Sequence, residues 1–437
     1  MTAAGQVVQR KRAGEPATGS STSASLLHRR RSMLGAVAVG VTCAALIRKG
    51  AFFLPDAWVF PLLLAGVAIA YRRRPSPGER RVLVALGAFC LWWAIASVAW
   101  GVPSRAPLLI GSAVGFGAAL VIGRSFDLSQ RAAIHRNVVA LGAVMAALGM
   151  AGIVYRAYPY AMAHDGLWRV AGTLTYANAA GLLLAMIAPL AIVLEGVHPA
   201  TRRVAIFLIV AGLIATESRG ALFAFVVVLP MLPRRCLREA LWAGLLALFA
   251  GVACIAAASG GHAQPLLALA LVGLAVIAGR GAPALRSRTS AALLLLVFAA
   301  AVALATHPSA TSRLSTATLE LRTTEWSAAY RVAKAHPIAG GGPEKNLPLN
   351  NRGAFAYFAH NEYLQIAAGG GLVALALLGL AGAAVVGVVD RRTWQSEAAT
   401  ASLLIFAVGG VFDFTWHAPA LGIVAGWIAA LAFRGDR

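Results

Sequence analysis

The sequence predicts an all-α polytopic membrane protein, a bundle of about 12–14 transmembrane helices with one extended loop that contains short helices. Of its 437 residues, 59% are hydrophobic and 12% are charged, whereas soluble domains carry roughly 25% charged residues. The hydrophobic residues form unbroken runs of ~15–20 residues, which suit spanning helices better than the alternating ~10-residue segments of a β-barrel. Only residues 306–360 stay polar over a long stretch, and such a stretch must lie in water because lipid cannot satisfy its backbone.

The chain divides into two regions by composition. Residues 1–32 are rich in Ser, Ala and Gly and end in a basic cluster, so we expect a disordered cytoplasmic tail. Residues 33–437 form the predicted transmembrane domain, which includes the polar loop 306–360. Its apolar runs lie at 33–47, 52–71, 82–100, 107–123, 137–155, 177–194, 203–216, 220–233, 240–258, 265–279, 289–305, 361–389, 397–412 and 418–434.

The positive charge of the chain follows this topology. The net charge is +22, and the basic residues collect in alternate turns between apolar runs, so we expect no nucleic-acid partner. The positive-inside rule puts both termini in the cytoplasm and the loop 306–360 on the outer side of the membrane. The four cysteines lie in or beside apolar runs without metal-ligand spacing, which predicts buried thiols with no disulfide and no metal.

One arginine lies where two short apolar runs meet on the predicted outer side. Arg219 belongs to the turn TESRG at 216–220. In one interpretation it is a phosphate clamp, because a guanidinium stays charged and grips oxyanions in a fork. In the other it forms an ion pair with Glu217 or extends along the membrane interface. The sequence leaves both open.

A second arginine lies in the polar loop. Arg322 shares a face with Trp326 on an amphipathic helix that we expect around 319–330. It is either a second anion contact or a solvated charge. The helix ends at the Gly- and Pro-rich turn 336–343, whose backbone N–H groups form a candidate nest for an anion.

A histidine lies where the polar loop re-enters the membrane. Imidazole titrates near neutrality, so His360 is a candidate base for a hydroxyl group, with Glu362 or Gln365 to hold it. The alternative is an interfacial histidine that caps the next helix.

Two further outer turns carry polar residues beside apolar runs. Asp413 and His417 are four residues apart with aromatic residues between them, and they either line a pocket or belong to an interfacial belt. Asn178 follows a run of small residues, which indicates a re-entrant turn or a helix cap. No P-loop, zinc-site or serine-hydrolase motif is present, so we predict no cofactor and no metal.

Taken together, five segments resemble the O-antigen ligase and O-antigen polymerase superfamily of bacterial envelope proteins. They fall in the family's order, although the chain has more predicted spans and a shorter loop than we expect of a ligase. The segments are GTLTYANAAG (172–181), ESRGALFAF (217–225), LRTTEWSAAYRVAKAHPIAGGGPEKN (321–346), AHNEYLQIAAGGGLVALALL (359–378) and FDFTWHAPA (412–420).

The resemblance implies a metal-independent inverting glycosyltransferase of the GT-C type in the bacterial cytoplasmic membrane. Its donor is a glycan on undecaprenyl pyrophosphate, and its acceptor is a hydroxyl of lipid A–core, of a glycan or of a protein. By this resemblance Arg219 and Arg322 contact the pyrophosphate and His360 activates the acceptor. We expect the substrate-binding residues to be Arg219, Arg322, Asn361, Glu217, Asp413, His417 and Asn178.

A ligase is the favoured function, and a polymerase and a protein O-oligosaccharyltransferase are the alternatives within the family. A transporter of lipid-linked substrates is the alternative from another class. It predicts charged residues in mid-span and internal pseudo-symmetry, and the sequence shows neither. Membrane lipids are the remaining expected partner.

Overall fold

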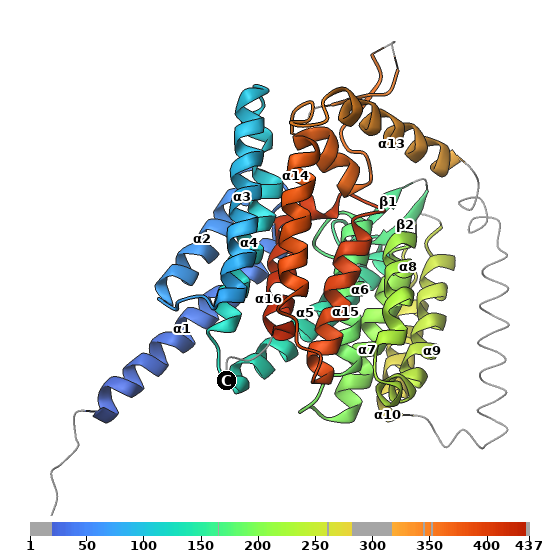
Figure 1. Ribbon diagram of the computed structural model, residues 1–437. Helices are drawn as coiled ribbons and strands as arrows, with labels where there is room; N and C mark the ends of the chain where they lie inside the picture. Colours follow the sequence, from blue (N-terminus) through green and yellow to red (C-terminus); the bar gives the residue numbers. More distant parts are fainter. Residues whose placement is uncertain are drawn as a thin grey trace, which may run out of the picture.

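The computed structural model describes residues 20–164, 166–259, 262–281, 317–343, 346–350 and 353–433. They form a helical bundle with two small hairpins (Figure 1). The helices are α1 (Ser20–Ile47), α2 (Asp56–Ala70), α3 (Pro77–Ala99), α4 (Pro107–Arg124), α5 (Leu128–Tyr155), α6 (Ala177–Ile192), α7 (Pro199–Ala215), α8 (Arg219–Val228), α9 (Arg234–Ala256), α10 (Pro265–Arg280), α13 (Ala317–Ala335), α14 (Glu362–Val386), α15 (Trp394–Gly409) and α16 (Pro419–Ala432). Short 3-10 helices are η1 (Lys49–Ala51), η2 (Pro103–Arg105), η3 (Leu229–Met231) and η5 (Thr415–His417).

Three helices form the interior of the bundle. Helices α4, α6 and α16 are buried along nearly their whole length, and α16 packs extensively against α4. Their sequences are apolar on every side, as expected of helices that are surrounded by protein. Small residues permit the close approach: a Cβ on Gly422 of α16 would lie 2.5 Å from the carbonyl oxygen of Ser112 in α4.

The outer helices expose large apolar side chains. Among the described residues, six helices are long and apolar enough to cross a membrane, and shorter apolar helices accompany them. The exposed apolar residues include Leu62, Ile69, Val84, Leu91, Val272, Val276, Leu380 and Val386. Such an apolar perimeter suits contact with lipid. The chain is an integral membrane protein.

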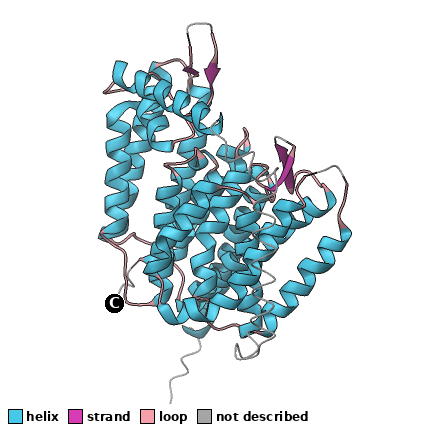
Figure 2. Cartoon of the chain, turned by 90° about the vertical axis from the view of Figure 1, so that its right-hand side faces the viewer, coloured by secondary structure: helices cyan, strands magenta, loops and turns pink. Residues whose placement is uncertain are grey.

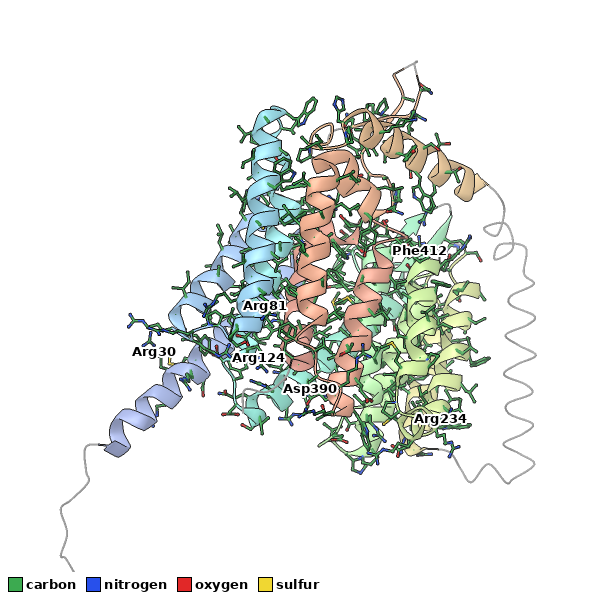
Figure 3. The ribbon with its side chains drawn as sticks, viewed as in Figure 1. Arg30, Arg81, Arg124, Arg234, Asp390 and Phe412 are labelled. Atoms are coloured by element: carbon green, nitrogen blue, oxygen red, sulfur yellow. The ribbon has the colours of Figure 1, made fainter. Side chains whose placement is uncertain are left out.

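The two ends of the bundle differ in charge. Figure 3 shows Arg30, Arg81, Arg124 and Arg234 toward one end, and Phe412 toward the other. Helix α13 lies at the Phe412 end (Figure 1), and both hairpins lie there too (Figure 2). They are β1 (Ala161–His164) with β2 (Leu167–Val170), and β3 (Leu347–Pro348) with β4 (Phe355–Ala356), each antiparallel. We call this end the α13 end.

Two runs of three glycines meet at the α13 end. The N–H groups of Gly341 and Gly342 donate to the carbonyls of Ala368 and Gly369 in α14, at 2.7 and 3.2 Å. The helix breaks at Gly371, whose φ is 71°. The turn 336–343 is therefore bound to α14, and the prediction that these two N–H groups form an anion-binding nest is wrong.

The helical pattern was largely predicted. Each of the expected apolar runs falls on a described helix except 289–305, which lies outside the described residues. The expected amphipathic helix is α13. Helix α1 begins at Ser20, so helical structure extends into the segment 1–32 that we expected to be a disordered tail. The hairpin β1–β2 was not predicted.

Candidate functional site

The centre of the candidate site is a histidine–aspartate pair. Nδ1 of His360 lies 3.1 Å from Oδ1 of Asp413. His360 precedes α14 and has a positive φ of 47°, a conformation that non-glycine residues adopt at a cost and that concentrates at functional sites. Asp413 lies in the turn between α15 and η5 and is 5% exposed. His360 is half-buried, so the pair has one partner that solvent or a ligand can reach.

Asp413 is held by several hydrogen bonds. The hydroxyl of Tyr176 lies 2.8 and 2.7 Å from its two carboxylate oxygens, Nδ2 of Asn178 donates to Oδ2, and the N–H of Phe414 donates to Oδ1. Burial opposes ionisation of Asp413, but the hydrogen bonds from His360 and Tyr176 outweigh it and lower its pKa. Burial and the Asp413 charge raise the pKa of Tyr176 well above its ordinary value, so this phenol remains a donor.

These bonds determine the chemistry of His360. An ionised Asp413 only accepts hydrogen bonds, so Nδ1 of His360 donates to it. In the neutral ring the lone pair is then on Nε2. The arrangement can accept a proton at Nε2 while the carboxylate stabilises the resulting imidazolium.

Arg169, which the sequence analysis did not identify, supports this network from β2. Its Nε donates to the carbonyl of Thr216 and its Nη2 to Oδ1 of Asn178, both at 2.8 Å. It therefore ties the hairpin to α6 and to the turn before α8. The Asp165-Gly166 dipeptide of the sequence, a frequent hairpin turn, is the signal that would have indicated β1–β2.

Arg322 and the residue that follows Arg219 approach the same short segment. Nη1 of Arg322 donates to the carbonyl of Phe412 at 3.0 Å. Arg219 is the exposed first residue of α8, and a Cβ on the next residue, Gly220, would lie 2.4 Å from Cβ of Phe412. Arg322 and the start of α8 therefore both approach Phe412, which directly precedes the His360 partner Asp413. Figure 3 labels Phe412 below α13.

Aromatic rings stack beside the pair. Phe414 lies between Tyr176 and Phe358, with ring centroids at 5.3 and 4.0 Å and nearly parallel planes. The ring of His360 contacts Phe414 edge-on at 5.0 Å. These contacts fix the plane of the imidazole in addition to the hydrogen bond to Asp413.

A second carboxyl group lies near the pair on α13. Glu325 is 6% exposed. Burial raises its pKa, against the attraction of the His360 and Arg322 charges. Its neighbour Trp326 donates from Nε1 to the carbonyl of His360 at 3.4 Å. Helix α13 therefore covers the pair with both charged and aromatic side chains.

Several predicted substrate-binding residues have other contacts. Nδ1 of His417 lies 2.8 Å from Oε1 of Glu362, and both side chains are 0% exposed. His417 therefore cannot touch a substrate in this conformation, and Glu362 is not the partner of His360. Gln365 accepts the N–H of Ala359, and Asn361 caps α14 by accepting the N–H of Leu364 at 3.0 Å.

The remaining predictions are placed as follows. Asp413 is buried behind His360, so it positions the histidine instead of lining a pocket. Asn178 bridges Arg169 and Asp413, and Tyr176, not Asn178, is the N-cap residue of α6. Glu217 is half-buried in the turn before α8 with a φ of 52°. Within the described ranges, no three His, Cys, Asp or Glu side chains gather closely enough to hold a metal ion.

Comparisons with known proteins bear on the same residues. A search of curated proteins found no match. Residues 204–379 match the family model described as O-antigen ligase. The matched segment contains Arg219, Arg322 and His360, whereas Asn178 precedes it and Asp413 follows it. The resemblance to the O-antigen ligase and O-antigen polymerase superfamily is thereby confirmed over residues 204–379.

Proposed function

We propose that this protein transfers a glycan from undecaprenyl pyrophosphate to an acceptor hydroxyl, as an O-antigen ligase does. The observation that carries the proposal is the meeting of the His360–Asp413 pair, Arg322 and the start of α8 at residues 412 and 413. The family match supports glycan transfer of this general type. The donor, the acceptor and the roles of individual residues are our proposal.

The two arginines take the leaving group in this mechanism. Arg219 is exposed at the start of α8. A guanidinium offers five N–H donors, of which Arg322 uses one from Nη1 for the carbonyl of Phe412. Oxyanions of a pyrophosphate are suited to such donors, and charge stabilisation is largest where charge develops in the transition state. The arginines therefore stabilise the pyrophosphate as the anomeric C–O bond breaks.

His360 prepares the acceptor. Nε2 takes the hydroxyl proton while the acceptor oxygen forms its bond to the anomeric carbon from the opposite face. The electron pair of the broken C–O bond stays with the pyrophosphate. Asp413 stabilises the imidazolium until its proton passes to solvent. The product has the inverted anomeric configuration, and no metal ion takes part in the proposed steps.

The basic residues support a direction for the site. The Arg-rich end of the bundle suits the cytoplasmic side under the positive-inside rule. The α13 end then faces the exterior of the bacterial cytoplasmic membrane, which is where we propose that transfer occurs.

In vitro transfer tests the proposal directly. The purified full-length protein in lipid nanodiscs receives an undecaprenyl-pyrophosphate glycan and, in separate reactions, lipid A–core, a glycan repeat unit or a protein acceptor. Transfer to lipid A–core identifies a ligase, and transfer to the other two identifies a polymerase or a protein O-oligosaccharyltransferase. Arg219→Ala, Arg322→Ala and His360→Ala abolish transfer, whereas Arg392→Ala, at an arginine with a 62% exposed side chain, retains it. Near-normal transfer in all three site variants contradicts the proposal.

A further inference from the structure

A cavity of about 400 Å³ lies at the α13 end, outside the site described above. Its lining comes from Trp100 at the end of α3, from α13, from the turn after α13, from β3 and from the first turns of α14. None of Arg219, Arg322, His360 and Asp413 lines it. The cavity therefore has room for a part of a ligand that does not take part in the proposed transfer step.

The polar lining is basic and partly aromatic. Arg331 is exposed on its wall, where Nη2 donates to the carbonyl of Pro348 at 3.1 Å and so orients the guanidinium. The rings of Trp100 and His336 meet edge-on with centroids 5.2 Å apart. Among the described lining residues none is Asp or Glu. The described part of the wall therefore presents a guanidinium and aromatic rings without a competing carboxylate.

This combination suits one class of ligand. The C–H face of a pyranose ring packs on an aromatic side chain, as apolar surfaces do. A carboxylate on the same sugar is the natural partner of a guanidinium, which binds planar anions in a fork. Asn346 adds a polar side chain to the lining. A neutral sugar would pack on the aromatic ring but would not form the ion pair with the guanidinium.

The cavity shares a residue with the transfer site. Gln365 lines the cavity and is 1% exposed. Its Oε1 accepts the N–H of Ala359 at 2.9 Å, and Ala359 directly precedes His360. The cavity and the turn that carries His360 are therefore linked through Gln365.

We propose that this cavity binds an acidic sugar residue of a glycan substrate through Arg331 and Trp100. The proposal rests on the proposed function, because it assigns the cavity to one of the two glycans that meet at His360. The acidic sugar belongs either to the donor or to the acceptor.

Direct binding tests the proposal without transfer. The probe is an oligosaccharide that contains a hexuronic acid, compared with the same oligosaccharide after reduction of its carboxyl group. Each is titrated into the full-length protein in nanodiscs. The wild type binds the acidic form about tenfold or more tightly than the reduced form. Arg331→Gln removes this preference, Trp100→Ala weakens both forms, and Lys334→Gln, on an exposed residue of α13 outside the lining, changes neither.

Two results overturn the proposal. One is a wild type that does not discriminate between the two forms, and the other is an Arg331→Gln variant that keeps the preference. Arg331→Lys, which keeps the charge, retains part of the preference and so separates charge from a general defect in folding.

Transfer kinetics then identify the source of the sugar. If the acidic sugar belongs to the acceptor, Trp100→Ala raises the KM for the acceptor and leaves the KM for the donor unchanged. If it belongs to the donor, Trp100→Ala raises the KM for the donor and leaves the KM for the acceptor unchanged. His360→Ala still binds the oligosaccharide. Binding without any transfer by the wild type therefore contradicts the proposed function alone, whereas transfer with unchanged KM in both cavity variants contradicts the cavity assignment alone.

Discussion

Oδ1 of Asp413 lies 3.1 Å from Nδ1 of His360, although the two residues are 53 positions apart in the chain. The carboxylate is itself fixed by Tyr176 and Asn178. A base that is oriented by a buried carboxylate keeps one tautomer and one ring orientation. The structure thus gives His360 a support that nearby residues in the sequence do not provide.

Asp413→Asn reduces the rate of transfer. The amide nitrogen of the new side chain would donate a hydrogen bond, so it would favour the tautomer with the proton on Nε2 and remove the charge that stabilises the imidazolium. We expect kcat to fall by about 10²–10⁴-fold. The measurement is steady-state transfer with the purified variant, at equal amounts of folded protein.

Asp390→Asn is the matched control, because it makes the same chemical change near the Arg-rich end (Figure 3). It leaves kcat unchanged. Wild-type kcat in Asp413→Asn would show that His360 does not depend on the carboxylate.

Arg169→Lys tests the support of the network from the hairpin. The guanidinium joins two acceptors, the carbonyl of Thr216 and Oδ1 of Asn178, with two different nitrogens. A single ammonium group cannot reproduce this fork. We expect about a tenfold loss in kcat, with the KM for the donor unchanged, because Arg169 acts through Asn178 and Asp413.

Arg131→Lys provides the comparison. Arg131 also donates from Nε and Nη2 to two carbonyls, those of Phe126 and Arg124, but in α5, away from the site. It leaves kcat as in the wild type. Equal kcat in the two variants refutes the positioning role of Arg169.

The helices were predictable because apolar runs long enough to span a membrane indicate helices that are buried in lipid or protein. Arg219, Arg322 and His360 became candidates through their place beside such runs and through the family resemblance. The side-chain partners of such residues could not be predicted in the same way. Glu362 and Gln365 follow His360 directly, yet Glu362 faces His417 and Gln365 accepts a backbone N–H.

The failure has a physical cause. Packing across the whole bundle determines which helix ends lie together. The spacing of residues within one segment does not predict these contacts. Asp413 and His417 were grouped because they are four residues apart, whereas the structure directs them to different partners, His360 and Glu362. Arg169 was missed because no hairpin was predicted between the apolar runs 137–155 and 177–194.

Glu325 makes stability depend on pH. Its pKa is raised in the folded protein, chiefly by burial. The folded state therefore holds the proton more tightly than the unfolded chain, and stability falls as the pH rises from the ordinary carboxyl pKa through the raised one. Glu325→Gln removes this dependence, so its melting temperature exceeds that of the wild type by an increasing margin across this window.

Thermal unfolding in detergent over a series of pH values measures the margin. Glu195→Gln, at an exposed carboxylate, is the control and shows no such margin. A margin that is constant with pH for Glu325→Gln contradicts the prediction.

The break in α14 depends on glycine at position 371. Its φ is 71°, and a Cβ there would lie 2.1 Å from the carbonyl oxygen of Ile338, so Gly371→Ala combines backbone strain with a clash against the turn 336–343. We expect a loss of about 1–3 kcal/mol in the free energy of unfolding. Gly382→Ala, in the same helix with nothing within 4 Å of its Cβ, is neutral or stabilising by up to about 1 kcal/mol. Melting temperatures in detergent separate the two variants. Equal melting temperatures would mean that the contact between the two glycine runs does not hold α14 in its broken form.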